Sequence, residues 1–203
     1  MKQYSLIFLF LLFSCGNKED ILLPKSNVTI VSDVKDHSPI YIFFRTKGKD
    51  TLAAVNRNNS IISTNWILNI DKRLPLRLVI PEVMKLQEKK RSEVAHKNEL
   101  ADNYYSYADS LGKNMAFLPF TKVYYKMEKP MFSFVVFFSK KNDIFVDGFS
   151  GSREELKHFL NSSNFKDKMI RFGFDEDMSY GTYIQNEIFI QSLKIENKEE
   201  FVY

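Results

Sequence analysis

The chain has 203 residues and a formal net charge of +4, with 44% hydrophobic and 27% charged residues. Phenylalanine is frequent (19 residues) and glycine is rare (7), which excludes a disordered or low-complexity chain. The length predicts a single globular unit with a substantial core. A basic balance can indicate nucleic acid as a partner, but the export signal described next argues against it.

Residues 1–14 are typical of a secretory signal peptide. Lys2 precedes an apolar run from Leu6 to Phe13, which is shorter than the roughly 20 residues that a membrane-spanning helix needs. The stretch Leu-Phe-Ser-Cys that ends at Cys15 resembles a bacterial lipobox. The resemblance implies that Cys15 becomes the N-terminus and carries acyl chains such as palmitate. An ordinary signal peptide with an incidental cysteine is the alternative.

Residues 15–27 are expected to form a lipid-anchored tether, since Pro24 disfavours regular structure. Lys18, Glu19 and Asp20 resemble a surface-export signal of lipoproteins in one group of Gram-negative bacteria. A plain polar linker is the alternative. The sequence thus predicts an exported protein that is lipid-anchored to the cell envelope at the outer membrane, on either its periplasmic or its surface face.

Residues 28–129 are predicted to form a first α+β half. Runs of β-branched and aromatic residues predict its strands. These strands are residues 28–31, 40–44, 51–55, 66–70 and 116–127. Apolar residues at helical spacing predict one long amphipathic helix over about residues 81–111, which Gly112 would end.

Residues 130–203 are predicted to form a second α+β half that begins at Pro130. A hairpin over residues 132–147 should lead into a short helix, where Ser152 and Glu155 have the spacing of a capping box. The remaining elements predicted are a strand over 170–174, a helix over about 180–193 and a strand over 200–203.

A faint repeat relates the two halves. Residues 67–80 align with residues 171–184, and Asp71 then matches Asp175. An aspartate that leaves a strand can cap the next helix and favours the positive end of its dipole. We therefore expect Asp71 and Asp175, like Ser152, to be structural caps. The predicted fold is α+β, with two faintly repeated strand-helix-strand halves and a sheet that has helices packed on one side.

The second half also resembles the periplasmic domain of the ExbD/TolR family. That resemblance is carried by the order of hairpin, capped helix, strand, helix and terminal strand, and by the step from Asp175 to Tyr180-Gly181. Ser179 stands where the family favours proline. The resemblance implies an envelope module that pairs with itself, as in a homodimer, and that serves biopolymer transport. No counterpart of the family's proton-handling transmembrane helix is found, so only the folded module is expected to carry over.

Motifs for catalysis or metal binding are missing from the sequence. His37, His96 and His158 lie in separate segments without ligand spacing, and the acidic run 175–177 does not form a calcium loop. No metal, cofactor or nucleic acid is therefore expected. The sequence predicts a non-enzymatic envelope protein that binds the lipid bilayer through Cys15 and binds an envelope protein or peptidoglycan. The alternatives are an unrelated surface lipoprotein that binds a nutrient or host ligand, and a hydrolase assembled from distant segments.

Overall fold

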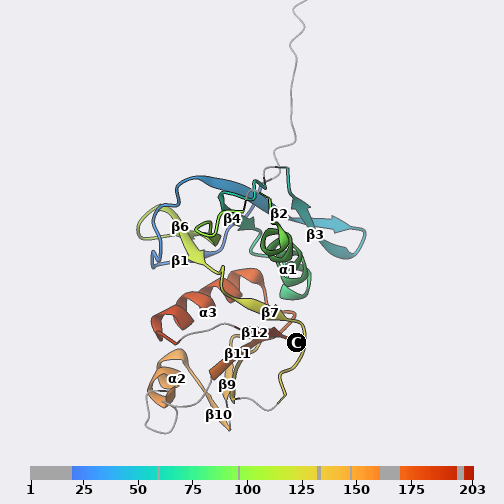
Figure 1. Cartoon of the computed structure of the whole chain (residues 1–203). Coiled ribbons are helices and arrows are strands. Elements are labelled where there is room, and N and C mark those ends of the chain that lie inside the picture. Colours follow the sequence, from blue (N-terminus) through green and yellow to red (C-terminus); the bar gives the residue numbers. More distant parts are fainter. Residues whose placement is uncertain are drawn as a thin grey trace, which may run out of the picture.

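The computed structural model describes residues 20–58, 60–95, 97–131, 134–146, 148–160, 170–195 and 199–203. The expected signal peptide and Cys15, Lys18 and Glu19 of the expected tether lie outside these ranges. Within them the α+β class is confirmed, with three helices and two mixed sheets of six strands each. Figure 1 shows the two sheets one above the other. The strands thus form two sheets rather than one continuous sheet.

The first sheet contains β1 (Lys25–Ser26), β2 (His37–Lys47), β3 (Asp50–Asn56), β4 (Asn65–Ile70), β5 (Asn103–Asp109) and β6 (Asn114–Pro119). Strand β2 forms a hairpin with β3 and runs parallel to β4, which runs parallel to β5. Helix α1 (Leu76–Ser92) connects β4 with β5. Strand β6 pairs antiparallel with β5, and the short β1 pairs parallel with it.

The second sheet contains β7 (Tyr124–Lys126), β8 (Phe134–Phe138), β9 (Ile144–Val146), β10 (Phe149–Gly151), β11 (Ile170–Phe174) and β12 (Glu199–Val202). Strand β8 forms a hairpin with β9 and runs parallel to β11, which runs parallel to β12. Helix α2 (Arg153–Leu160) precedes β11, and α3 (Tyr180–Ser192) connects β11 with β12. The order β9-β8-β11-β12 and its strand directions repeat those of β3-β2-β4-β5.

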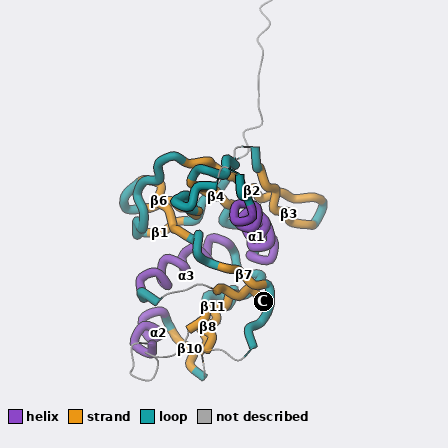
Figure 2. Tube along the Cα trace, in the orientation of Figure 1, coloured by secondary structure: helices purple, strands orange, loops and turns teal. Residues whose placement is uncertain are grey.

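One hydrophobic core joins the two halves. It contains Trp66 and Leu68 of the first sheet and Phe172 and Phe174 of the second, all of them fully or almost fully buried. Helices α1 and α3 contact each other, and Figure 2 shows them side by side between the strands of the two halves. The two halves therefore fold as one unit around a shared interior.

The helix predicted over residues 81–111 is confirmed as far as Ser92 and is wrong beyond that residue. Helix α1 begins at Leu76, ends at Ser92 and contains Pro81, and the later residues form strand β5. Proline costs the helix a hydrogen bond, but it lies near the helix start, and the burial of neighbouring apolar side chains offsets the loss. Val94 and Leu111, which the helical spacing placed on the buried stripe, are 89% and 73% exposed.

Three other boundaries differ from the expectation. Residues 116–127 split into β6 and β7, and β7 pairs with β12, so the second sheet begins before residue 130. Residues 28–31 form only an isolated bridge between Val31 and Phe117. The tether predicted over residues 15–27 is also shorter. Leu22 already donates its N–H to Asp71 Oδ2 at 3.2 Å, and β1 belongs to the first sheet.

Candidate functional site

The segments that enter α1 and α3 lie against each other. Pro75 and Ser179, which occupy equivalent positions of the repeat, form an antiparallel bridge. The N–H of Leu76 donates to the carbonyl of Met178 at 3.0 Å, and the N–H of Tyr180 donates to the carbonyl of Leu74 at 2.7 Å. The two bonds are equivalent: replacing each residue by its counterpart in the other half turns one bond into the other.

A second pair of bonds has the same symmetry. The N–H of Arg77 donates to the carbonyl of Glu176 at 2.8 Å, and the N–H of Gly181 donates to the carbonyl of Lys72 at 3.0 Å. The first N–H groups of a helix have no partner within the helix. Here the first two N–H groups of each helix bond carbonyls of the other half of the chain. The halves are thus paired about a local two-fold axis that passes between Pro75 and Ser179.

The expected capping roles of Asp71 and Asp175 are wrong. Helix α1 has Pro75 at its N-cap without a side-chain bond, and Ser179 caps α3 by accepting from the N–H of Thr182. Each aspartate instead stabilises a turn in the segment between the strand and the helix. Asp71 Oδ1 accepts from the N–H two residues later at 3.0 Å, and Asp175 Oδ1 does the same at 2.9 Å. The helix begins only after this turn, too far along for the aspartate to reach it.

Asp71 accepts more hydrogen bonds than Asp175 and is more deeply buried. It is fully buried and binds Arg73 through Nε at 2.8 Å and Nη2 at 2.7 Å, besides holding Leu22. Burial raises the pKa of Asp71, but the bonds from Arg73 and Leu22 outweigh it and bring the pKa below its ordinary value. Asp175 Oδ2 accepts only from the N–H of Lys140, at 3.1 Å.

We expect Asp71→Ala to lower the free energy of unfolding by about 2–3 kcal/mol. The substitution removes a buried carboxylate together with its hydrogen bonds from the Arg73 guanidinium and from two backbone N–H groups. Asp175→Ala should cost about 1 kcal/mol, since only a turn is weakened. Asp175→Asn should cost less, because its amide oxygen still accepts the turn bond. Urea denaturation of the three variants checks this order, and an equal loss from both alanine variants would contradict it.

Ser152 has the expected structure. Its hydroxyl accepts from the N–H of Glu155 at 3.3 Å, and the Glu155 carboxylate accepts from the N–H of Ser152 at 2.7 Å. This reciprocal pair is a capping box, and it holds the pKa of Glu155 below its ordinary value. The box fixes the start of α2, where Arg153 follows directly.

A cluster of buried carboxyl and phenol groups lies between the two halves. Glu187 of α3 and Glu200 of β12 are both buried, and their carboxyl groups interact, which disfavours a charge on both at once. Tyr183 donates to Glu200 Oε2 at 2.6 Å. The Tyr183 hydroxyl bonds that of Tyr125 at 3.2 Å, and Tyr125 in turn bonds Tyr105 at 2.8 Å. The chain of hydroxyls thus connects the second sheet with β5 of the first.

Burial raises the pKa of Glu187 well above its ordinary value, and the neighbouring Glu200 carboxyl raises it further. Within the part of the chain that the structure describes, Glu187 Oε1 has no hydrogen-bond partner, which is a costly state for a charged oxygen. The pKa values of Tyr105, Tyr125 and Tyr183 are raised by burial as well, so these phenols stay protonated. The cluster therefore holds its protons tightly in the folded protein.

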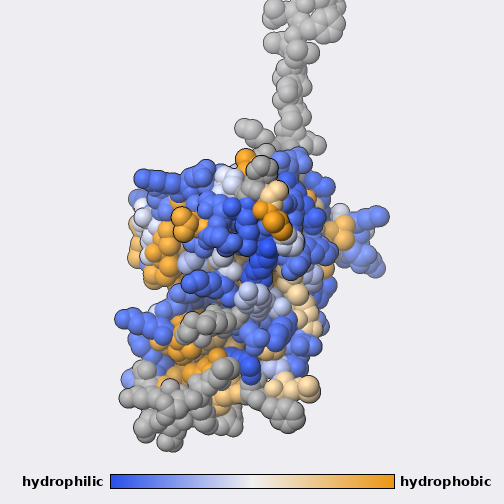
Figure 3. All heavy atoms as spheres, in the orientation of Figure 1, coloured by the Kyte–Doolittle hydropathy of each residue, from blue (hydrophilic) through white to orange (hydrophobic). Residues whose placement is uncertain are grey.

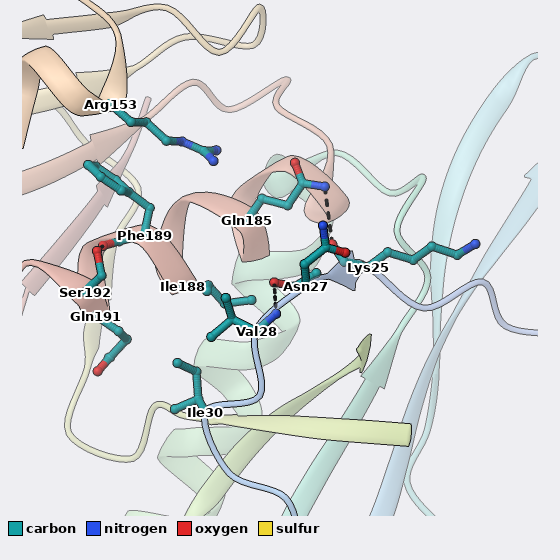
Figure 4. Close-up of a pocket in the computed structure, with 11 residues that line it drawn as sticks. Lys25, Asn27, Val28, Ile30, Arg153, Gln185, Ile188, Phe189, Gln191 and Ser192 are labelled. Carbon is teal, nitrogen blue, oxygen red and sulfur yellow. Dashed lines mark hydrogen bonds between the residues drawn. The ribbon is translucent and has the colours of Figure 1, made fainter. Parts of the chain in front are cut away.

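A groove lies beside α3 on the opposite side from this cluster. Residues 25–30 form one wall and the face of α3 with Gln185, Ile188 and Phe189 forms the other (Figure 4). Arg153 of α2 closes one end of the groove. The cavity measures about 710 Å³, within the range of about 300–1,000 Å³ that is usual for small-ligand sites. We call this cavity the α3 groove.

Comparisons of the chain with family models, curated proteins and solved structures found no match.

The structure separates most residues that the sequence singled out. Asp20 is exposed, Ser152 lies at the start of α2, and His37 bonds the carbonyl of Val34 through Nδ1 at 2.7 Å. In the described ranges, no three histidine or acidic side chains gather as a metal site would need. No helix among the described residues has both the length and the apolar character needed to cross a membrane.

The α3 groove and the buried cluster were not predicted. One signal in the sequence could have indicated the cluster: Glu187 follows Tyr183 by one helical turn on the buried face of the predicted helix. A carboxyl at such a position is rarely buried without a partner. The groove left no comparable signal, because its walls come from segments that are far apart in the chain.

Proposed function

We propose that the chain is a lipid-anchored envelope protein that works by binding, without catalysis, and that its folded part is an ExbD/TolR-like module present twice. The observation that carries this proposal is the symmetric pairing of the links around Pro75 and Ser179. The resemblance implied a module that pairs with itself. Both modules of such a pair would be supplied by one chain here, and Cys15 would fix the pair to the membrane.

The partner we propose is another envelope component, either a protein or peptidoglycan. Support comes from the topology shared by the halves, hairpin followed by two parallel strands, which agrees with the order of elements that suggested the family. An unrelated surface lipoprotein that binds a nutrient or host ligand is the second candidate. The α3 groove favours that candidate, because a cavity of this size suits a small ligand.

Cell fractionation tests the anchor. We expect the wild-type protein in the membrane fraction and Cys15→Ala in the soluble fraction or uncleaved, because each buried CH₂ of an acyl chain contributes about 0.8 kcal/mol. Ser14→Ala, which keeps the cysteine, serves as the control and should stay in the membrane. Incorporation of labelled fatty acid into the Cys15→Ala protein would contradict the proposed attachment.

Two defined experiments test the binding role. The purified lipidated chain is sedimented with isolated peptidoglycan, and cross-linking in intact cells traps protein neighbours. We expect one of these to give a discrete complex that withstands moderate salt. A chain that neither sediments with peptidoglycan nor cross-links to an envelope protein would refute the proposed function.

A further inference from the structure

We propose that the α3 groove binds a short peptide that presents a free terminal carboxylate to Arg153 and an apolar side chain to the wall around Val28. This goes beyond the proposed function, because it concerns a small-ligand site and does not depend on the lipid anchor. Figure 4 shows the guanidinium of Arg153 directed toward the groove, with Phe189 beside it.

The charge of the groove suits an anion. Arg153 Nη2 donates to the neutral amide oxygen of Asn186 at 2.7 Å, and its Cζ lies 5.6 Å from the centre of the Phe189 ring. Arg153 Nε is buried and has no acceptor among the described residues. Burial lowers the pKa of Arg153, so its charge is poorly solvated. The neighbouring Glu154 attracts the Arg153 charge from outside the groove. Among the described residues that line the groove none is acidic, and a ligand carboxylate would add a directly bonded counter-charge there.

The polar side chains of the groove suit a peptide rather than a simple anion. Asn27 and Gln191 each carry an amide with both donors and an acceptor, and in the described part of the chain neither side chain is hydrogen-bonded. Gln185 donates to the carbonyl of Lys25 at 3.3 Å and keeps its own oxygen available. Peptide groups offer both a donor and an acceptor, whereas an inorganic anion such as sulfate or the carboxylate of a fatty acid offers acceptors only.

The apolar side chains provide the third contact. Val28 is 50% exposed although it is a large hydrophobic residue, and Ile30, Ile188 and Phe189 line the groove near it. Figure 3 shows apolar surface gathered on the side of the molecule where α2 and α3 lie. An apolar ligand side chain packed against Val28 would remove this surface from water. Leucine is a side chain of suitable size.

The test uses the full chain in lipid nanodiscs and isothermal titration with the dipeptide Leu-Leu and with its C-terminal amide. We expect the free acid to bind at least about tenfold more tightly than the amide, since a charge-assisted bond to Arg153 is lost in the amide. Arg153→Gln should remove this preference. Lys25→Gln is the control and should retain it, because the side chain of Lys25 points away from the groove (Figure 4).

A second pair of variants separates binding from folding. Val28 is half exposed, so neither Val28→Glu nor Val28→Gln should change the melting temperature. The two side chains have nearly the same shape and both remove the apolar contact, so Val28→Gln should weaken binding of the acid, whereas the added carboxylate of Val28→Glu should abolish it. Equal binding of acid and amide, equal binding by both Val28 variants, or binding of octanoate in place of the dipeptide would overturn the proposal. Failure of the wild type to bind the dipeptide would also overturn it.

Discussion

Glu187→Gln is expected to stabilise the protein at neutral and alkaline pH and to flatten the dependence of its stability on pH. The folded state raises the pKa of Glu187 above the ordinary value of 4.5. A group with a raised folded pKa contributes its full stability below the unfolded pKa, and the contribution is lost as the pH rises through the folded pKa. Each unit by which the pKa is raised corresponds to about 1.4 kcal/mol.

Glutamine keeps a neutral side chain of the same shape and can donate to Glu200, so the variant should lose little at acidic pH. Urea denaturation at about pH 5, close to the ordinary pKa, and at about pH 8.5, well above it, measures the effect. Wild-type stability should fall between these values, and that of Glu187→Gln should fall much less. Parallel curves for both proteins would show that Glu187 does not titrate as its burial requires.

Glu199→Gln is the matched control, and Glu199 lies on β12 directly before Glu200. Its carboxylate lies 2.7 Å from Lys126 and 3.3 Å from Arg171, and these partners bring its pKa below the ordinary value. The contribution of Glu199 is therefore present above the unfolded pKa and lost as the pH falls, which is the opposite direction. The Glu199 side chain is 33% exposed, so its replacement should cost no more than about 1 kcal/mol. It should also leave the fall in stability at alkaline pH unchanged.

The second large effect is expected at the pairing of the two links. A side chain at position 181 would place its Cβ 3.1 Å from the Cβ of Lys72 and 3.3 Å from the carbonyl oxygen of Lys72. Gly181→Leu should therefore push the links apart and lower the free energy of unfolding by about 2 kcal/mol or more. Overpacking costs about 1–3 kcal/mol, and each opened backbone bond adds about 1 kcal/mol.

The repeat provides the control for this substitution. Arg77 is the equivalent of Gly181 in α1, and its side chain reaches solvent, where Nε bonds Asp177 at 2.9 Å. Both partners are about half exposed, so Arg77→Leu should cost less than about 1 kcal/mol. Urea denaturation compares the two leucine variants. Equal stability would mean that the close approach of the links does not hold the halves together.

Elements with a clear local pattern were predicted well. The strands over residues 66–70 and 170–174 and the helix over about 180–193 follow from runs whose burial is decided by neighbours along the chain. The alignment of Asp71 with Asp175 also located equivalent positions of the two halves. It could not give the role of these residues, because the turn and the helix start are four residues apart.

The failures have a common physical origin. Residues 103–109 were assigned to a helix because their apolar spacing fits one, yet pairing with β4 and β6 makes them a strand. The buried cluster joins β5, β7, α3 and β12, and the α3 groove joins α2, α3 and residues 25–30. Such sites depend on contacts between distant segments, which a single sequence does not display.

Because both halves belong to one polypeptide, their pairing is independent of protein concentration. Two separate chains would dissociate on dilution, whereas covalently connected halves meet at a high and constant effective concentration. A symmetric dimer also receives every substitution twice. Within one chain each half can change alone, as Pro75 facing Ser179 and Arg77 opposite Gly181 already illustrate. Substitutions on the face of α3 that lines the groove therefore need no counterpart on α1.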